Sequence, residues 1–151
     1  MKKNIKYLII IIVAILLDQF VKYLVIDNLK VYQSFPLIKN FLYITLVYNT
    51  GAAFSMFNEM TFLIAVVSIV VLVYLVRDMN KEKTHNFTKS MLCAGIIGNL
   101  IDRVFRQSVV DFINIHIFKY SFPVFNFADI YIVISIIVLM IYNIKEDLCK
   151  K

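Results

Sequence analysis

Four long apolar runs constrain the fold of this chain more than any other feature of its sequence. They cover roughly residues 7–26, 61–76, 87–103 and 128–144, and the second contains no charged residue. A helix needs about 17–25 residues to cross the hydrocarbon core of a bilayer. With 61% hydrophobic and 17% charged residues among 151, the chain has more apolar surface than a soluble domain of this size can bury. We therefore predict a single membrane domain, residues 1–151, that is mainly α-helical and has four transmembrane helices.

The first apolar run resembles a signal peptide, because Lys2, Lys3 and Lys6 precede it. No small-residue cleavage site follows this run, however, and the apolar character resumes beyond Lys22. We therefore expect a membrane helix that is retained in the mature protein.

The basic residues predict how the chain is oriented. Ten of the sixteen basic residues flank the apolar runs on one side of the predicted membrane: Lys2, Lys3, Lys6, Arg77, Lys81, Lys83, Lys89, Lys145, Lys150 and Lys151. An excess of Lys and Arg marks the cytoplasmic side of a membrane protein. Both termini are therefore predicted to be cytoplasmic. The same placement explains the net charge of +6, so we expect no nucleic-acid partner.

Two segments, residues 27–60 and 104–127, are then predicted to face outward. Each contains a stretch rich in β-branched and aromatic residues, Phe41–Tyr48 in the first and Val109–Phe125 in the second. The Asn-Thr-Gly sequence that ends at Gly51 is typical of a turn. Exposed backbone at a membrane must be paired or buried in protein. We therefore predict a small β-rich subdomain at the outer surface.

Ionisable residues within membrane segments are costly and usually mark a functional site or a paired group. In this chain they gather at one level, near the predicted outer surface: Asp18, Lys22, Asp102, Arg103, Asp111 and Asp129. Their common level predicts a single polar site that opens toward the outer leaflet.

Two of the four aspartates have basic neighbours along the chain. Asp18 and Lys22 are spaced i,i+4 and can pair on a helix. Asp102 precedes Arg103, which is itself i,i+4 from Asn99, so we expect a structural polar network there.

The other two aspartates, Asp111 and Asp129, have no basic residue within four positions. Two neighbouring carboxyl groups can share one proton, so that one activates water while the other polarises a carbonyl, as in aspartic peptidases. Asp129 alone could equally be a helix cap. His85 and His116 are isolated, and no metal-ligand spacing is visible, so we do not expect a metalloprotease.

Five short motifs, in order along the chain, resemble those of the bacterial lipoprotein signal peptidase (type II signal peptidase) family. They are Asp18-Gln-Phe-Val-Lys22, Asn49-Thr-Gly51-Ala-Ala-Phe, Gly95 with Gly98-Asn99-Leu-Ile-Asp102-Arg103, Val110-Asp111-Phe112 and Phe125-Asn126-Phe-Ala-Asp129. The resemblance implies that Asp111 and Asp129 form a catalytic dyad. It also implies two further sets of residues. The site would be lined or supported by Asn49, Gly51, Gly95, Asn99, Arg103, Asn126 and Ala128, while Asp18, Lys22 and Asp102 would have structural or substrate-positioning roles.

The resemblance further implies the reaction and its setting. Family members remove signal peptides from prolipoproteins by cutting just before a diacylglyceryl-modified cysteine, and globomycin inhibits them. They need no metal or cofactor, so we expect none here. We accordingly expect a monomeric multi-pass enzyme in the bacterial cytoplasmic membrane, in contact with membrane lipid, with its active site near the outer face.

Two alternatives remain open from the residues alone. The polar cluster could bind an ion or a partner in a non-enzymatic membrane protein, although a transporter would carry polar groups nearer the midplane. An intramembrane aspartic peptidase with unlipidated substrates would use the same chemistry.

Overall fold

The part of the chain that the structure describes folds into four long helices and one small antiparallel sheet. The computed structural model describes residues 2–50, 58–81, 84–118 and 120–149. In chain order the elements are α1 (Lys2–Asn28), β1 (Ser34–Ile38), β2 (Leu42–Asn49), α2 (Asn58–Lys81), α3 (Asn86–Arg106), β3 (Val109–Ile117), β4 (Tyr120–Ser121) and α4 (Phe127–Cys149). The predicted fold class, mainly α-helical with a small β-rich part, is confirmed.

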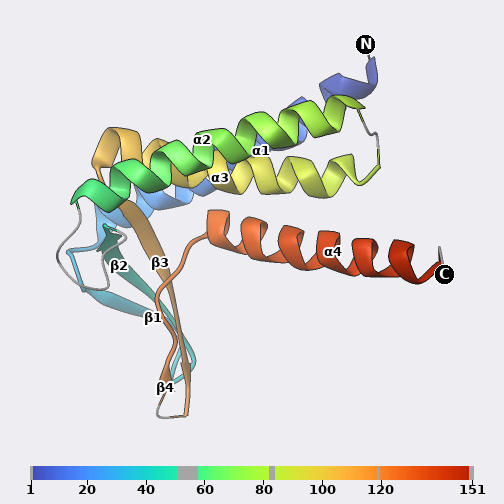
Figure 1. The fold of residues 1–151 in the computed structure, drawn as a ribbon. Coiled ribbons are helices and arrows are strands. Elements are labelled where there is room, and N and C mark those ends of the chain that lie inside the picture. The colour runs from blue at the N-terminus through green and yellow to red at the C-terminus, as the bar shows by residue number, and fades with distance from the viewer. Residues whose placement is uncertain (1, 51–57, 82–83, 119, 150–151) are drawn as a thin grey trace.

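The helices lie side by side, and the sheet extends from one end of the bundle (Figure 1). The first turn of α1 and the last turn of α4 lie at the opposite end (Figure 1). Each helix is longer than the apolar run that predicts it, since helical structure continues into the polar residues at its ends. The sheet therefore lies at one end of the helix bundle, opposite the start of α1 and the end of α4.

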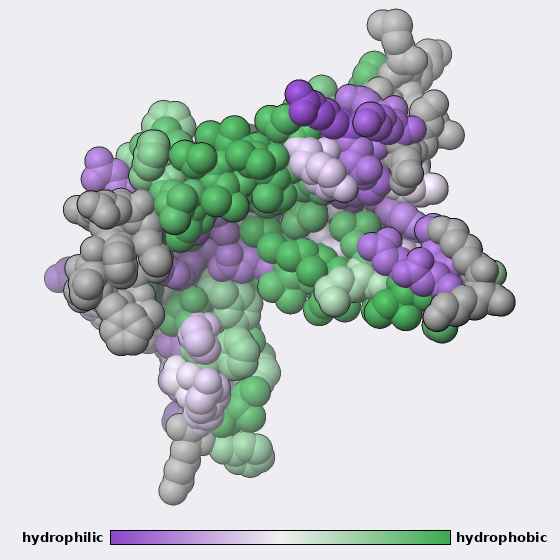
Figure 2. Space-filling view, viewed as in Figure 1, coloured by the Kyte–Doolittle hydropathy of each residue, from purple (hydrophilic) through white to green (hydrophobic). Residues whose placement is uncertain are grey.

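Three of the four helices contain stretches long and apolar enough to cross a membrane, namely Ile5–Asn28, Phe62–Lys81 and Phe127–Cys149. The exception is α3, which packs against α1, α2 and α4 and so presents less surface to lipid. A central helix can carry polar residues because protein surrounds them, and α3 buries Lys89, Asn99 and Asp102. Figure 2 shows hydrophobic surface over the helices, with hydrophilic residues where the sheet joins the bundle and at the far end.

The sheet has the strand order β1-β2-β3-β4, and every neighbouring pair is antiparallel. The predicted β-prone stretches correspond to β2 and to β3 with β4. A small apolar cluster joins the sheet to the C-terminal part of α1, and its buried residues are Val25, Leu46, Val110 and Phe112. The sheet is thus fixed to the bundle rather than tethered by loops alone.

A left-handed residue brings β3 back toward the helices. Gln107 has a φ of 59° and ends α3, after which the chain reverses and β3 begins at Val109. The backbone N–H of Val110 donates to the Asp102 carboxylate at 3.1 Å. This reversal places Asp111 beside the end of α3.

Candidate active site

Asp129 is held by a capping box at the start of α4. The Asn126 side chain accepts a hydrogen bond from the Asp129 backbone N–H at 2.9 Å, and the Asp129 carboxylate accepts one from the Asn126 N–H at 3.2 Å. Such reciprocal bonds satisfy backbone donors that a helix N-terminus leaves unpaired. Asn126 lies immediately before the helix, so its partnership with Asp129 is a cap, the alternative that the sequence left open for Asp129.

Asp111 lies on β3 and is only 2% exposed. Its carboxylate accepts a hydrogen bond from the Asn49 amide at 2.9 Å and another from the Asn126 amide at 2.7 Å. Asn49 reaches it because the last residue of β2 pairs with Val109 at the start of β3. Asn126 therefore contacts both aspartates that lack basic neighbours in the sequence.

Asn99, on α3, completes this bridge. Its amide nitrogen donates to Asp129 at 2.7 Å, while its oxygen accepts from the Asn126 amide at 3.2 Å. The Asn99 oxygen also lies 3.3 Å from the Lys22 ammonium. Two asparagines thus join Asp111 to Asp129 by a continuous set of hydrogen bonds.

The surroundings of Asp111 change its acidity. Burial raises the pKa of the Asp111 carboxyl to about 6, an effect partly offset by the Asn49 hydrogen bond. The negative charge of Asp129 adds to the rise, whereas the Asn126 hydrogen bond and the charge of Lys22 lower it. Asp111 therefore titrates much closer to neutrality than an exposed aspartate does.

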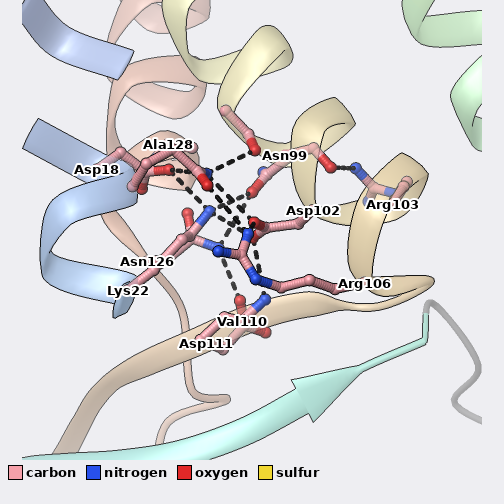
Figure 3. Close-up of polar contacts among 12 residues, drawn as sticks. Asp18, Lys22, Asn99, Asp102, Arg103, Arg106, Val110, Asp111, Asn126 and Ala128 are labelled. Carbon is pink, nitrogen blue, oxygen red and sulfur yellow. Dashed lines mark hydrogen bonds and ion pairs between the residues drawn. The ribbon is translucent and has the colours of Figure 1, made fainter. Parts of the chain in front are cut away.

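A network of buried charges lies next to Asp111 and Asn126 (Figure 3). The Lys22 ammonium lies 2.8 Å from both the Asp18 and the Asp102 carboxylates, and all three side chains are at most 1% exposed. The predicted i,i+4 pairing of Asp18 with Lys22 is confirmed. Asp18 also accepts a hydrogen bond from the backbone N–H of Ala128 at 3.0 Å. The network therefore connects α1, α3 and the start of α4.

The polar network expected around Asp102 exists, but its partners differ from those that the sequence indicated. Arg103 donates to the backbone carbonyl of Asn99 at 3.2 Å, and its charge acts on Asp129, Asp102 and Asp111. Asp102 instead forms ion pairs with Lys22 and with Arg106. Adjacent residues on a helix point in different directions, which is why Arg103 does not pair with Asp102.

Two polar residues of this network were missed from the sequence. The Gln19 amide donates to Asp18 and to Asp102, both at 3.2 Å, and its oxygen accepts from Arg106 at 3.0 Å. The spacing of Arg106, i,i+4 from Asp102, is the sequence signal that could have identified it.

Close packing of α3 against α4 explains why the predicted site residue at position 95 is a glycine. A Cβ on Gly95 would lie 2.5 Å from the Ala128 carbonyl oxygen, so α3 can approach the start of α4 this closely only with glycine. At Gly98 an added Cβ would meet the Asp18 carboxylate at 2.9 Å. Gly51, the remaining predicted residue, lies outside the described residues.

An apolar groove of about 500 Å³ opens beside the Asp129 carboxylate. Asp129 lines it together with Phe122, Phe125, Ile130 and Val133. Among the described residues, no group of three or more His, Cys, Asp or Glu side chains is placed to hold a metal ion. The chemistry that this arrangement supports is acid–base catalysis by two carboxyl groups, next to a surface suited to hydrocarbon.

The comparisons with known proteins agree with the motifs. The curated relatives include a lipoprotein signal peptidase of Halalkalibacterium halodurans, 37% identical over 145 residues and covering 93% of each chain. Another, from Anoxybacillus flavithermus, is 37% identical over 149 residues and covers 96% of this chain and 89% of its own.

Solved structures agree as well. One structure of a bacterial membrane enzyme, determined by the in meso method at 2.3 Å, is 36% identical with a TM-score of 0.86 and covers 97% of this chain and 92% of its own. A second, at 1.9 Å, is 35% identical with a TM-score of 0.86 and covers 93% of each chain. The family described as Signal peptidase (SPase) II matches residues 10–145, which is most of the sequence. On this combined evidence, the chain belongs to the signal peptidase II family.

Proposed function

We propose that this chain is a membrane aspartic endopeptidase that removes signal peptides from prolipoproteins by cutting just before the diacylglyceryl-modified cysteine. Asp111 and Asp129 are its catalytic pair. The observation that carries the proposal is the amide bridge, in which Asn126 and Asn99 hold two carboxyl groups of different environments in one site. Membership of the signal peptidase II family supports the same reaction.

In this mechanism one carboxylate takes a proton from the attacking water, and the protonated partner donates to the carbonyl oxygen of the scissile peptide bond. We assign the shared proton to Asp111, because burial raises the pKa of its carboxyl to about 6. The tetrahedral intermediate then breaks down as the leaving amine takes a proton from the dyad. Asn49, Asn99 and Asn126 keep the two carboxyl groups oriented through the cycle.

The apolar groove supports a substrate that carries lipid. It begins at Asp129 and is continued by Ile130 and Val133 on α4 and by the segment 122–125. An acyl chain attached to the residue after the scissile bond would lie in this groove, where each buried methylene contributes about 0.8 kcal/mol. If the residue after the scissile bond were small and carried no lipid, no part of the substrate would fill this groove.

A cleavage assay with a diacylglyceryl prolipoprotein in detergent tests the reaction. We expect Asp111→Asn and Asp129→Asn each to lower kcat by a factor of about 10⁴ or more, whereas Asp147→Asn, the same change at an exposed site, leaves it unchanged. Full activity in either dyad variant would refute the catalytic assignment. Equal cleavage of an unlipidated precursor would refute the lipid requirement while leaving the acid–base chemistry in place.

We also propose that the protein lies in the bacterial cytoplasmic membrane as a monomer, with both termini in the cytoplasm and the dyad near the outer face. It would bind membrane lipid and globomycin-type inhibitors. Two observations support this orientation. Basic residues gather at the predicted cytoplasmic side, and the first turn of α1 lies at the same end of the bundle as the last turn of α4 (Figure 1).

The two cysteines allow a direct test of this orientation. Cys149 is exposed near the end of α4, whereas Cys93 is only 1% exposed inside the bundle. A membrane-impermeant maleimide should therefore label Cys149 only after the cells are lysed. Labelling of Cys149 in intact spheroplasts would reverse the proposed orientation, and the Cys149→Ser variant provides the background signal.

A further inference from the structure

Each proposed catalytic aspartate follows a residue whose backbone N–H is bound by a buried carboxylate. Asp102 accepts from the N–H of Val110 at 3.1 Å, one residue before Asp111. Asp18 accepts from the N–H of Ala128 at 3.0 Å, one residue before Asp129. The two contacts have the same form although they join different pairs of elements, α3 with β3 and α1 with α4.

A single lysine joins these two carboxylates. Lys22 is completely buried, and its ammonium group lies 2.8 Å from Asp18, 2.8 Å from Asp102 and 3.3 Å from the Asn99 oxygen. An ammonium group has three donors, so all of them are used. Asn99, which accepts from Lys22, donates its amide N–H to Asp129, so this one side chain links the lysine to Asp129.

The network is also balanced in charge, and two further polar side chains complete it. Arg106 pairs with Asp102, so that two carboxylates face two cations. Gln19 donates to Asp18 and to Asp102 and accepts from Arg106. Each carboxylate thereby has partners on both of its oxygens, which keeps it from rotating.

Such a network is a poor way to gain stability. Removing charges from water costs several kcal/mol per ion, and apolar residues of similar volume often stabilise a core as well or better. What buried charges can supply is a fixed geometry, because breaking any contact leaves an unpaired group. Here the buried charges fix the backbone at Val110 and Ala128, the residues that precede the two aspartates.

We propose that Asp18, Lys22 and Asp102 form a backbone clamp, completed by Gln19 and Arg106, that positions the catalytic pair without touching the substrate. This inference rests on the proposed function, since it assigns the clamp a role in that reaction. The clamp sets the distance between the two carboxyl groups through Val110 and Ala128. These residues are positioning residues, and their loss lowers turnover more than substrate binding.

The test compares Asp18→Ala and Asp102→Ala with a matched control, Asp78→Ala. Asp78 forms an ion pair with Lys89, which α3 buries near its start, and this pair lies far along the helix from the dyad. The first measurement is amide hydrogen exchange at Val110 and Ala128. We expect faster exchange at Ala128 in Asp18→Ala and at Val110 in Asp102→Ala, and no change at either amide in the control.

The second measurement is steady-state cleavage of the lipidated precursor. We expect kcat to fall about 100-fold in both clamp variants with KM changed less than about threefold, because a shift of about 1 Å in a catalytic group can have this effect. The control keeps the wild-type kcat. If an alanine variant fails to fold, Asp18→Asn replaces it: its one remaining oxygen cannot accept from both Lys22 and Ala128.

The two measurements separate the clamp from the reaction. Unchanged kcat in folded clamp variants, or exchange at Val110 and Ala128 that does not respond, would refute the clamp. If the wild type does not cleave the lipidated precursor but the exchange pattern is as expected, the proposed function fails while the clamp as a structural device remains. A kcat loss of the same size in Asp78→Ala would show a general effect of ion-pair loss and also refute the inference.

Discussion

The buried carboxyl of Asp111 should make the stability of this protein fall between about pH 4 and pH 6. Folding raises the pKa of Asp111 from its ordinary value of 3.8 to about 6. The folded state therefore binds this proton more tightly than the unfolded state, and the resulting stability is fully present below about pH 4. It is lost as the pH rises through the folded pKa, since the unfolded chain then ionises the group more easily.

The difference of about 2 pH units corresponds to about 3 kcal/mol, because one unit is worth 1.36 kcal/mol. Asp111 is only 2% exposed, so solvent screening does not reduce this value much. In the variant Asp111→Asn the side chain at this position cannot ionise, so the variant does not lose this stability as the pH rises. For a chain of this length, about 3 kcal/mol corresponds to roughly 6–12 °C in Tm. The Tm of Asp111→Asn minus that of the wild type should therefore increase by this amount between pH 4 and pH 7.5.

Thermal unfolding followed by far-ultraviolet circular dichroism in detergent measures this difference, since the chain contains no Trp for fluorescence. All other titrating groups are common to both proteins and cancel to first order. Ser135→Ala, a change at a buried group that does not titrate, should show a Tm difference independent of pH. A constant difference between Asp111→Asn and the wild type, within about 2 °C over this range, would contradict the assigned burial effect.

Three further changes test the packing and the polar bridge. Gly95→Ala should lower stability by about 1–3 kcal/mol and reduce cleavage, since the new Cβ would lie 2.5 Å from the Ala128 carbonyl oxygen; wild-type Tm and activity would show that α3 and α4 need not approach so closely. Asn126→Ser should keep a capping oxygen, with Tm close to the wild type, while losing the donor to Asp111 and most of kcat; full kcat would show that the bridge is dispensable. Val133→Trp should fill the groove and raise KM for the lipidated precursor about tenfold, equivalent to about 1.4 kcal/mol, and an unchanged KM would place the lipid elsewhere.

Much of this architecture could be predicted from the sequence because it depends on local patterns. The four apolar runs identified the helices, and the i,i+4 spacing of Asp18 and Lys22 identified their ion pair. Stretches rich in β-branched and aromatic residues identified β2 and β3. Each of these signals lies within a short stretch of chain.

The partners of the site residues could not be found in this way. Lys22 and Asp102 are eighty positions apart in the sequence, and their contact depends on how α1 packs against α3. The same is true of Asn126 and Asp111, which meet because α4 begins beside the sheet. Sequence reasoning placed the ionisable groups at one level of the membrane, but only packing determines which of them touch.

The central position of α3 also changes what membrane insertion must accomplish. A charged residue in an inserting helix is costly, about 2.5–3.5 kcal/mol at the helix centre, and α3 carries charged residues near both of its ends. Asp18 with Lys22 on α1, and Asp102 with Arg106 on α3, are i,i+4 pairs within their own helices. Each helix can therefore enter the bilayer with its acid already neutralised by its own base. The contact between Lys22 and Asp102 can form only when α1 packs against α3, the two helices that supply the carboxylates bound to Ala128 and Val110.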